Sequence, residues 1–435
     1  MVTQTIKEKP VADSTASRAL AIFRLLFQDY HPRDFGISLW DGSHWPAENG
    51  AARFTLIVKH PNAMRGLIKA NNSDLSVSEA YINGDLEVEG DLEAAMPLGS
   101  YLASRKWPPL TMLRIGKNLL QLPRADRRRE KSSAPVDLSG EPHSMERDQQ
   151  AVSYHYDVSN DFYALWLDRQ MVYSCAYFET SDEGLDAAQA RKLDYLCRKL
   201  RLHSGERLLD IGCGWGGLII HAARKYGVNA LGITLSKNQA ALANRRIEQA
   251  GLQKQCRVEL RDYRNLNEAS GFEKIVSVGM FEHVGENRLP TYFQQAWRLL
   301  RPGGVFLNHG IANRVIDPEP SDLNFTNRYV FPDGDLVPIN VTLRLAEEVG
   351  FEVRDVESLR EHYVLTLRRW AERLEGRRHE ALQVVDERIF RIWRLFLSGS
   401  AHGFAAGLLN LYQTLLVKPV EGRSGLPLTR ADWYR

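Results

Sequence analysis

Three side chains able to move a proton or bind an anion follow two apolar runs in the second half of the sequence. KIVSVG is followed by Glu282 and His283, and PGGVFLNHG contains His309. Both runs have the length and composition of buried strands. Ligands in open α/β sheets collect at the carboxyl ends of the strands. We therefore expect these groups in one site capable of acid–base chemistry, although any single histidine at a sheet edge is more often structural.

A glycine turn predicts the ligand beside them. The stretch LLDIGCGWGG places Gly212 and Gly214 after an apolar run that ends near Asp210, and the amphipathic segment LIIHAARKYG follows. This pattern predicts a buried strand, a tight turn and a helix, the first unit of a nucleotide-binding sheet. Glycines there let the backbone approach a ligand at the helix amino terminus. Dinucleotide dehydrogenases have a similar turn, so the turn alone does not identify the nucleotide.

The residues at the end of the next apolar run help to identify the nucleotide. A dehydrogenase should carry an acidic residue there to hold the ribose hydroxyls. The sequence ITLSKNQ instead has Thr234, Leu235 and Ser236. The missing acid counts against NAD, and it is also unusual for ordinary S-adenosylmethionine (SAM) methyltransferases.

The segments around these residues alternate as in a doubly wound α/β sheet. Helical segments are predicted for residues 236–250, 289–300 and 359–374, and strands for QCRVEL, KIVSVG, PGGVFLNHG, FEVRDV and LNLYQTLLV. Asp262 and Tyr263 follow QCRVEL, at the position that faces the adenine in doubly wound methyltransferases. Tyr363 begins the last long helix.

One run is long enough to span a bilayer. Leu395–Val417 contains no Asp, Glu, Lys or Arg. It does contain several polar residues, and glycines at every fourth position that suit close packing in a membrane or in a buried soluble helix. We predict the buried form, with a short helix to about Gly407 followed by a strand.

The sequence resembles the cyclopropane fatty acid and mycolic acid cyclopropane synthases. The resemblance is carried by VSYHYDVSNDFYALWLDRQMVYSCAYF and TLSKNQ, and it covers roughly residues 150–418. It implies a class I SAM-dependent methyltransferase with a seven-stranded, doubly wound Rossmann-like α/β sheet and helical additions. The cofactor-binding residues expected from the motifs and the fold are Tyr173, Ser174, Asp210, Gly212, Gly214, Thr234, Leu235, Gln239, Asp262 and Tyr263.

The same resemblance implies a bound bicarbonate. The residues at the corresponding motif positions are Cys175, Glu282, His309, Ile311 through its backbone, and Tyr363. Several relatives have a cysteine at the position of Ser400. Because this chain has a serine there, a mechanism that uses a thiolate at that position is not expected. No metal site is expected, because the four cysteines lack CxxC or His-rich spacing.

The implied reaction transfers the methylene group of SAM to the cis double bond of unsaturated acyl chains in membrane phospholipids. Methyl transfer would leave a carbocation, and loss of a proton to bicarbonate would close a cyclopropane ring. The first alternative is a methylene or methyl branch from loss of a different proton. A lipid-binding module with a relic fold and a small-molecule or nucleic-acid methyltransferase are further alternatives.

Composition and charge favour a soluble globular protein of two domains. The chain has 435 residues, 44% hydrophobic and 25% charged, with a net charge of +2, which gives no reason to expect nucleic acid. We predict an α+β domain over residues 1–122 for lipid docking, assembly or stabilisation, a linker over 123–150, and a catalytic domain over 151–435. The linker's basic residues are either solvated or near anionic headgroups.

The location follows from the amino terminus and the resemblance. The first 20 residues contain charges and a proline where a signal peptide needs an apolar core. We expect a cytoplasmic protein, peripherally associated with the inner face of the cytoplasmic membrane. By analogy with relatives, it is also expected to form a homodimer.

Overall fold

A computed structural model describes residues 14–61, 63–64, 75–123, 138–314 and 325–434. The described residues form two compact units: residues up to 123 together with Phe325 belong to the first, and the other residues from 138 onward belong to the second. Helix α7 (Met145–Tyr156) begins inside the segment predicted as linker, because Ser144 caps it by accepting from the Arg147 N–H. The end of the predicted linker is therefore helical, and residues 124–137 lie outside the described residues.

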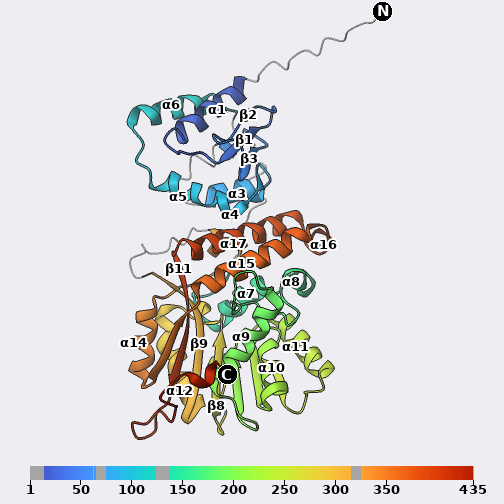
Figure 1. The fold of residues 1–435 in the computed structure, drawn as a ribbon, viewed down its shortest axis with the longest axis vertical. Helices are drawn as coiled ribbons and strands as arrows, with labels where there is room; N and C mark the ends of the chain where they lie inside the picture. The colour runs from blue at the N-terminus through green and yellow to red at the C-terminus, as the bar shows by residue number, and fades with distance from the viewer. Residues whose placement is uncertain (1–13, 62, 65–74, 124–137, 315–324, 435) are drawn as a thin grey trace, which may run out of the picture. The chain divides into compact units, whose positions relative to one another are not determined.

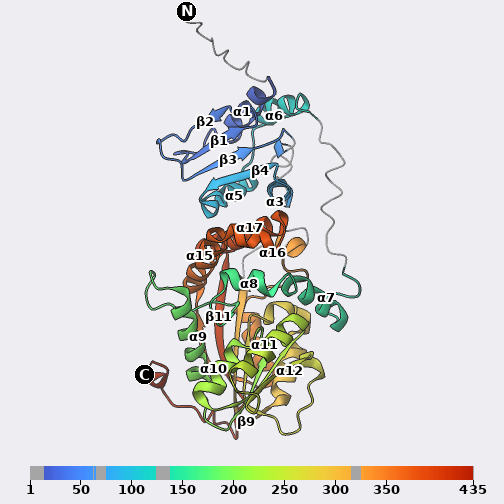
Figure 2. The same cartoon turned by 90° about the vertical axis from the view of Figure 1, so that its right-hand side faces the viewer.

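The first unit contains a four-stranded sheet in the order β2-β1-β3-β4, with the unit drawn in Figure 1 and all four strands labelled in Figure 2. β1 and β3 are parallel, and the other pairs are antiparallel. The strands are β1 (Phe35–Leu39), β2 (His44–Trp45), β3 (Phe54–Val58) and β4 (Leu86–Gly90). The helices are α1 (Ser14–Leu26), α3 (Leu75–Ile82), α4 (Leu92–Ala95), α5 (Pro97–Ser104) and α6 (Pro109–Leu120). The segment AMRGLIKAN, residues 63–71, has a sequence that predicts a short helix, and it lies largely outside the described residues.

The second unit contains the predicted seven-stranded sheet. Its order is β10-β11-β9-β8-β5-β6-β7, and only β11 runs antiparallel to its neighbours. The strands are β5 (Arg207–Ile211), β6 (Asn229–Thr234), β7 (Cys256–Leu260), β8 (Phe272–Val278), β9 (Leu300–Asn313), β10 (Glu352–Ser358) and β11 (Leu409–Val417). The order of the strands reverses between β5 and β8: the chain adds β6 and β7 on one side of β5 and then β8 on the other. Ligands of doubly wound folds bind at such a switch point.

Helices cover both faces of this sheet because neighbouring strand residues point to opposite sides. Leu208 and Leu415 belong to one apolar cluster, whereas Leu209 and Leu416 belong to another. The first cluster is covered by α9 (Leu185–Leu200), α10 (Gly217–Tyr226) and α11 (Lys237–Gln249). The second is covered by α12 (Leu289–Leu299) and α14 (Ile339–Val349).

A group of helices in the second unit packs across one end of its sheet. α15 (Arg360–Gly376) and α17 (Glu387–Ala405) lie side by side there (Figures 1 and 2). The shorter helices of the second unit are α8 (Asn160–Trp166), α13 (Phe325–Tyr329) and α16 (Arg378–Val384). A third apolar cluster joins Trp166 of α8, Trp370 of α15 and Leu397 of α17. In the described residues, no helix combines the length and apolar character needed to cross a bilayer.

Candidate active site

A pocket lies where β5, β6, β7 and β8 end. Its wall contains all ten residues predicted to bind the cofactor, namely Tyr173, Ser174, Asp210, Gly212, Gly214, Thr234, Leu235, Gln239, Asp262 and Tyr263. None of the five residues predicted for catalysis lines it. The predicted cofactor residues thus line one pocket, which is called the cofactor pocket because of that prediction, and the five residues predicted for catalysis lie outside it and are called the cluster.

The glycine turn has two glycines with different constraints. Gly212 has φ +86°, and an added Cβ would lie 2.7 Å from Cβ of Met280, which also lines the pocket. Gly214 has φ +54°, but nothing lies within 4 Å of an added Cβ. Gly212 is thus required by both conformation and close packing, whereas Gly214 is required by conformation alone.

The TLSKNQ segment is a capped helix start that shapes the pocket. Thr234 Oγ1 donates to Gln239 Oε1 at 2.7 Å, and Ser236 Oγ caps α11 by accepting from the Gln239 N–H at 3.1 Å. Ser236 Oγ also donates to Asp157 Oδ1 at 2.6 Å, just beyond α7. These bonds fix the wall made by Thr234, Leu235 and Gln239.

A buried lysine accompanies the predicted pocket residues. Lys192 of α9 is 2% exposed, lines the pocket and donates from Nζ to Ser174 Oγ at 2.6 Å. Burial lowers the pKa of Lys192 to about 8, opposed by the charges of Cys175, Asp168 and Asp210. Burial raises the pKa of Asp210 to about 7, opposed by Lys192. The sequence signal for this residue is a lysine among the apolar positions of LDAAQARKLDYL, which sequence reasoning missed.

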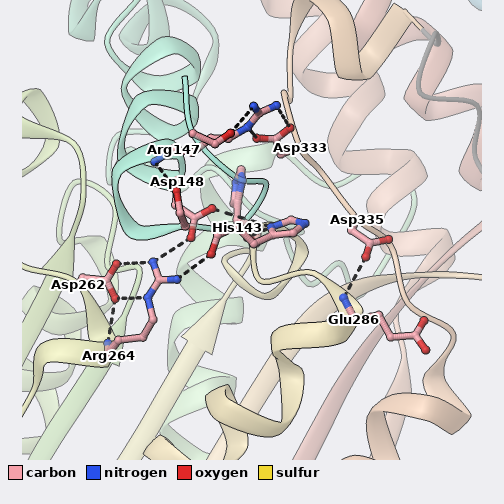
Figure 3. A network of polar contacts seen from close by, with 11 residues as sticks. His143, Arg147, Asp148, Asp262, Arg264, Glu286, Asp333 and Asp335 are labelled. Atoms are coloured by element: carbon pink, nitrogen blue, oxygen red, sulfur yellow. Dashed lines mark hydrogen bonds and ion pairs between the residues drawn. The ribbon is translucent and has the colours of Figure 1, made fainter. Parts of the chain in front are cut away.

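An arginine fixes the carboxylate at the predicted adenine position (Figure 3). Arg264 donates from Nε to Asp262 Oδ1 at 2.9 Å and from Nη2 to Asp262 Oδ2 at 2.6 Å. The same Nη2 donates to Asp148 Oδ2 of α7 at 2.8 Å. Both oxygens of Asp262 are therefore already in charge-assisted bonds, and Arg264 connects them to the helix that forms part of the pocket wall.

A second arginine fastens the same helix to a later loop. Arg147 donates from Nε to Asp333 Oδ2 at 2.5 Å and from Nη2 to Asp333 Oδ1 at 2.9 Å (Figure 3). In that loop, the Asp335 N–H donates to the Glu282 carbonyl at 2.9 Å. Sequence reasoning missed Asp148 and Arg264, because polar residues 145–150 were assigned to a linker and the pairing is purely tertiary.

The predicted catalytic carboxylate is buried and half satisfied. Glu282 lies in the short 3-10 helix η3 (Phe281–His283) after β8. Its Oε1 accepts the Ile311 N–H at 2.8 Å, and its Oε2 is buried without a partner among the described residues. Burial raises the pKa of Glu282 to about 7, opposed by the Ile311 N–H. At neutral pH this side chain can therefore either donate or accept a proton.

His309 is the second half-satisfied group. Gln413 of β11 lies opposite it, and Gln413 Nε2 is 3.2 Å from His309 Nδ1. His309 Nε2 is buried without a partner among the described residues. Burial and the positive charges of Lys192 and Lys199 hold the pKa of His309 well below its usual value, so the imidazole is neutral. Gln413 was absent from the predicted site because its strand register is not readable from the sequence.

Cys175 and Tyr363 complete the cluster. Cys175 is buried and Tyr363 is partly buried, and loss of solvation is the main cause that raises the pKa of each. The charges of Cys175 and Glu282 further raise the pKa of Tyr363, as expected for neighbouring groups. Tyr363 lies on the first turn of α15, and its ring centroid is 4.8 Å from that of Phe404.

Some of the residues predicted to hold a small oxyanion have atoms free to do so, and one does not. The unpaired atoms Glu282 Oε2 and His309 Nε2 suit an oxygen-rich ligand such as bicarbonate, since buried polar groups need partners. The Ile311 N–H differs from the expectation, because it donates to Glu282 and so is not free to hold an anion. Among the described residues, no group of three His, Cys, Asp or Glu side chains is arranged to hold a metal.

The cofactor pocket and the cluster adjoin. Gly279 and His283 line the pocket, and they flank Glu282 in sequence. The Gly279 N–H donates to the His309 carbonyl at 2.9 Å. The backbone that follows β8 therefore connects the pocket lining to Glu282 and to the strand that carries His309.

Comparison with known proteins agrees with this architecture. Residues 143–414 match the family model of mycolic acid cyclopropane synthetase. A probable fatty acid methyltransferase of Pseudomonas putida is 42% identical over 92% of this chain and 96% of that protein. The cyclopropane-fatty-acyl-phospholipid synthase of Escherichia coli K12 is 39% identical over 63% of this chain and 69% of its own.

A solved structure shows the same fold. The mycolic acid cyclopropane synthase CmaA1, complexed with SAH and CTAB, aligns with a TM-score of 0.58 at 35% identity, covering 62% of this chain and 97% of that chain. The resemblance inferred from the motifs is confirmed. The chain is an enzyme with the class I methyltransferase fold and belongs to the mycolic acid cyclopropane synthetase family.

Proposed function

We propose that the protein transfers the methylene group of SAM to the cis double bond of unsaturated acyl chains in membrane phospholipids, forming a cyclopropane ring. The observation that supports this best is that Glu282 Oε2 and His309 Nε2 are both buried without a partner among the described residues, on segments that adjoin the lining of the cofactor pocket through Gly279 and His283. Methyl transfer to an alkene leaves a cation from which a C–H proton must be removed, and a buried acid–base pair suits that step.

The reaction has two steps. The sulfonium methyl carbon bonds to one alkene carbon as its bond to sulfur breaks, which leaves S-adenosylhomocysteine (SAH) and a carbocation on the acyl chain. A proton then leaves the new methyl group, and its C–H electron pair closes the ring. An alkene is a weak nucleophile, so orientation of the two substrates must supply much of the rate enhancement.

The chain's own residues orient these groups. Arg264 fixes Asp262, Lys192 contacts Ser174, and the TLSKNQ turn fixes Gln239, so the cofactor pocket is rigid on several sides. Glu282 Oε2 and His309 Nε2 would hold bicarbonate, with Cys175 and Tyr363 beside them. When bound, bicarbonate supplies an oxyanion able to accept the departing proton. Burial of the cluster excludes water and strengthens its electrostatic interactions.

Aromatic rings next to the cluster suit a transient cation. The Tyr173 and Trp370 ring centroids are 5.2 Å apart, and those of Trp370 and Tyr363 are 6.1 Å apart. Ring faces attract positive charge. Phe281 instead packs against Tyr292 and Phe293 in the cluster beneath α12, so it supports η3 from the core side.

A methylene or methyl branch is a second candidate product, and the names of two relatives support it. The relatives that match over more than nine-tenths of this chain, from Pseudomonas putida and Mycobacterium tuberculosis, are named probable fatty acid methyltransferases. After the same first step, a 1,2-hydride shift would move the cation to the methyl-bearing carbon, and loss of a methyl proton would then give a methylene branch, which reduction converts into a methyl branch. The position of the base relative to the cation decides between the products.

Lipid mass spectrometry of a host expressing the chain tests both products. We expect acyl chains heavier by one CH₂ that resist mild hydrogenation, as a ring does. Uptake of hydrogen by the new product would establish an exocyclic methylene instead. Absence of SAH formation by the purified protein with unsaturated phospholipid would contradict both and favour a lipid-binding module with a relic fold.

Location and assembly belong to the same proposal. Because the acyl chains lie in a bilayer, the enzyme would work as a peripheral protein at the inner face of the cytoplasmic membrane. A homodimer is proposed by analogy with relatives, and size-exclusion chromatography with light scattering tests it.

A further inference from the structure

Helix α6 exposes leucines that a solvated helix would not carry. Leu110 is 71% exposed, Leu113 is 70% exposed and Leu120 is 84% exposed. α6 packs against α1 within the first unit, and its buried residue is Ile115 (Figure 2). The leucines therefore do not serve the contact between these two helices.

The exposed leucines share one face with a cation. Positions 110, 113, 117 and 120 are spaced by three and four residues, so they form one stripe along a helix. Lys117 occupies the remaining position of the stripe, and Arg114 lies beside it. Both cations are exposed.

The charged residues near this stripe in sequence are all positive, and one of them, Arg105, pairs with Asp29. Between Glu93 and Asp126 the sequence contains no acidic residue. Within the part of the chain that the structure describes, no carboxylate forms an ion pair with Lys106, Arg114 or Lys117. Trp107 precedes the helix, with the Arg105 guanidinium 5.0 Å from its ring centroid. An apolar and cationic surface with an aromatic residue at its end matches an interface that is both anionic and greasy.

We propose that α6 is a membrane-docking helix that lies in the headgroup region of anionic phospholipid bilayers. Leu110, Leu113 and Leu120 insert between lipids, and the neighbouring cations contact lipid phosphates. The proposal deepens the proposed function, since that function requires substrate from a bilayer. It does not depend on the methyl-transfer chemistry. A protein partner would need carboxylates placed beside an apolar groove in one specific arrangement. An anionic bilayer presents negative headgroups and apolar chains everywhere on its surface.

Vesicle sedimentation with the full-length protein tests this proposal. The apolar variant combines Leu110→Ser, Leu113→Ser and Leu120→Ser, and the charge variant combines Arg114→Glu and Lys117→Glu. Their controls are Leu428→Ser, a leucine 99% exposed in the second unit, and Arg245→Glu with Lys254→Glu, two exposed cations of the second unit.

On vesicles of phosphatidylglycerol and phosphatidylethanolamine, we expect each α6 variant to bind at least about tenfold more weakly than wild type. Both controls should bind like wild type, and wild type should bind phosphatidylcholine vesicles weakly. Unchanged vesicle binding by the apolar variant would overturn the proposal. So would a shift of that variant from dimer to monomer with unchanged vesicle binding, because the stripe would then face a second copy.

A turnover assay separates this proposal from the proposed function. With unsaturated phospholipid dispersed in neutral detergent, both α6 variants should form SAH at the wild-type rate. Circular dichroism of each variant verifies folding. If wild type binds vesicles through α6 but forms no SAH, the proposed function fails and the docking helix stands. If wild type forms SAH but the α6 variants bind vesicles as well as wild type does, only the docking proposal fails.

Discussion

The carboxyl group of Glu282 has one oxygen engaged and one without a partner. Replacing Glu282 with Gln preserves an acceptor for the Ile311 N–H but removes the ability to exchange a proton at Oε2. We expect kcat to fall at least about 100-fold, in the range typical of lost acid–base function, with SAH affinity nearly unchanged. Steady-state kinetics and calorimetry with SAH measure the two quantities.

A nearby glutamate provides the matched control for this substitution. Glu286 lies four residues later and is exposed. Glu286→Gln should leave both kcat and SAH affinity at wild-type values. An equal loss of turnover and SAH affinity in Glu282→Gln would mean that Glu282 serves cofactor binding or folding instead.

The same residue predicts how stability depends on pH. Burial raises the Glu282 pKa from 4.5 to about 7. Between these values the native state binds more protons than the unfolded chain, so the free energy of unfolding falls as pH rises through this window. Glu282→Gln does not titrate and should lose less stability over the same window. Denaturant unfolding of both proteins from about pH 4.5 to 7 checks this, and parallel pH profiles would contradict it.

At the scale of elements, the glycine turn offers a matched pair of substitutions. Both Gly212 and Gly214 have positive φ, but only at Gly212 would an added Cβ collide with Met280. We expect Gly212→Ala to weaken SAH binding at least about tenfold and Gly214→Ala to weaken it less, because strain in the second case is limited to the backbone. Calorimetry with SAH, with circular dichroism for folding, measures the difference. Normal binding by Gly212→Ala would contradict the cofactor placement.

Helix α7 is held over the cofactor pocket by Arg264, which bonds to Asp262 and Asp148 together. Arg264→Met removes both attachments, so we expect faster hydrogen exchange over residues 145–156 and SAH binding weaker by about tenfold, the scale of a lost charge-assisted bond. Arg257→Met, which removes an exposed cation paired with Glu259 on β7, is the control and should change neither quantity. Unchanged exchange in Arg264→Met would show that α7 is held by other contacts.

The success of sequence reasoning at this scale depended on how local the signal was. Strand β11 was predicted at its observed bounds, and the Gly212 turn was found because it follows a continuous apolar run. The beginning of α7 was missed because MERDQQ is polar and its cap, Ser144, follows a polar segment. β1, with the sequence FGISL, was not predicted, because Gly36 weakens the strand pattern of a segment as short as β5.

The same distinction applies to the site. The cofactor residues and the acid–base cluster were indicated by motif positions at strand ends. Lys192, Arg264 and Gln413 were not, because their roles come from contacts with Ser174, Asp148 and His309, respectively, which are distant in sequence. The separation into a pocket and an adjoining cluster also required the three-dimensional arrangement.

At the scale of the whole molecule, charge is nearly balanced but unevenly distributed. The net charge is +2, whereas the segment between Glu93 and Asp126 has only positive residues among its charged ones. The chain as a whole therefore has little attraction for an anionic surface, and a local region supplies it. Screening by salt should act on this region, since exposed charges interact over a Debye length of about 8 Å at physiological ionic strength.

We accordingly predict that salt affects capture of the bilayer and leaves the chemistry unchanged. Raising NaCl from about 50 mM to about 500 mM should increase KM for anionic vesicles several-fold at constant kcat, because screening weakens contacts between cations and headgroups. Turnover of unsaturated phospholipid in neutral detergent should not change, because the buried cluster around Glu282 and His309 is shielded from ions. The Arg114→Glu, Lys117→Glu variant should start from a higher KM and respond less to salt. An equal response of vesicle and detergent assays would place the salt effect in the active site instead of at the membrane.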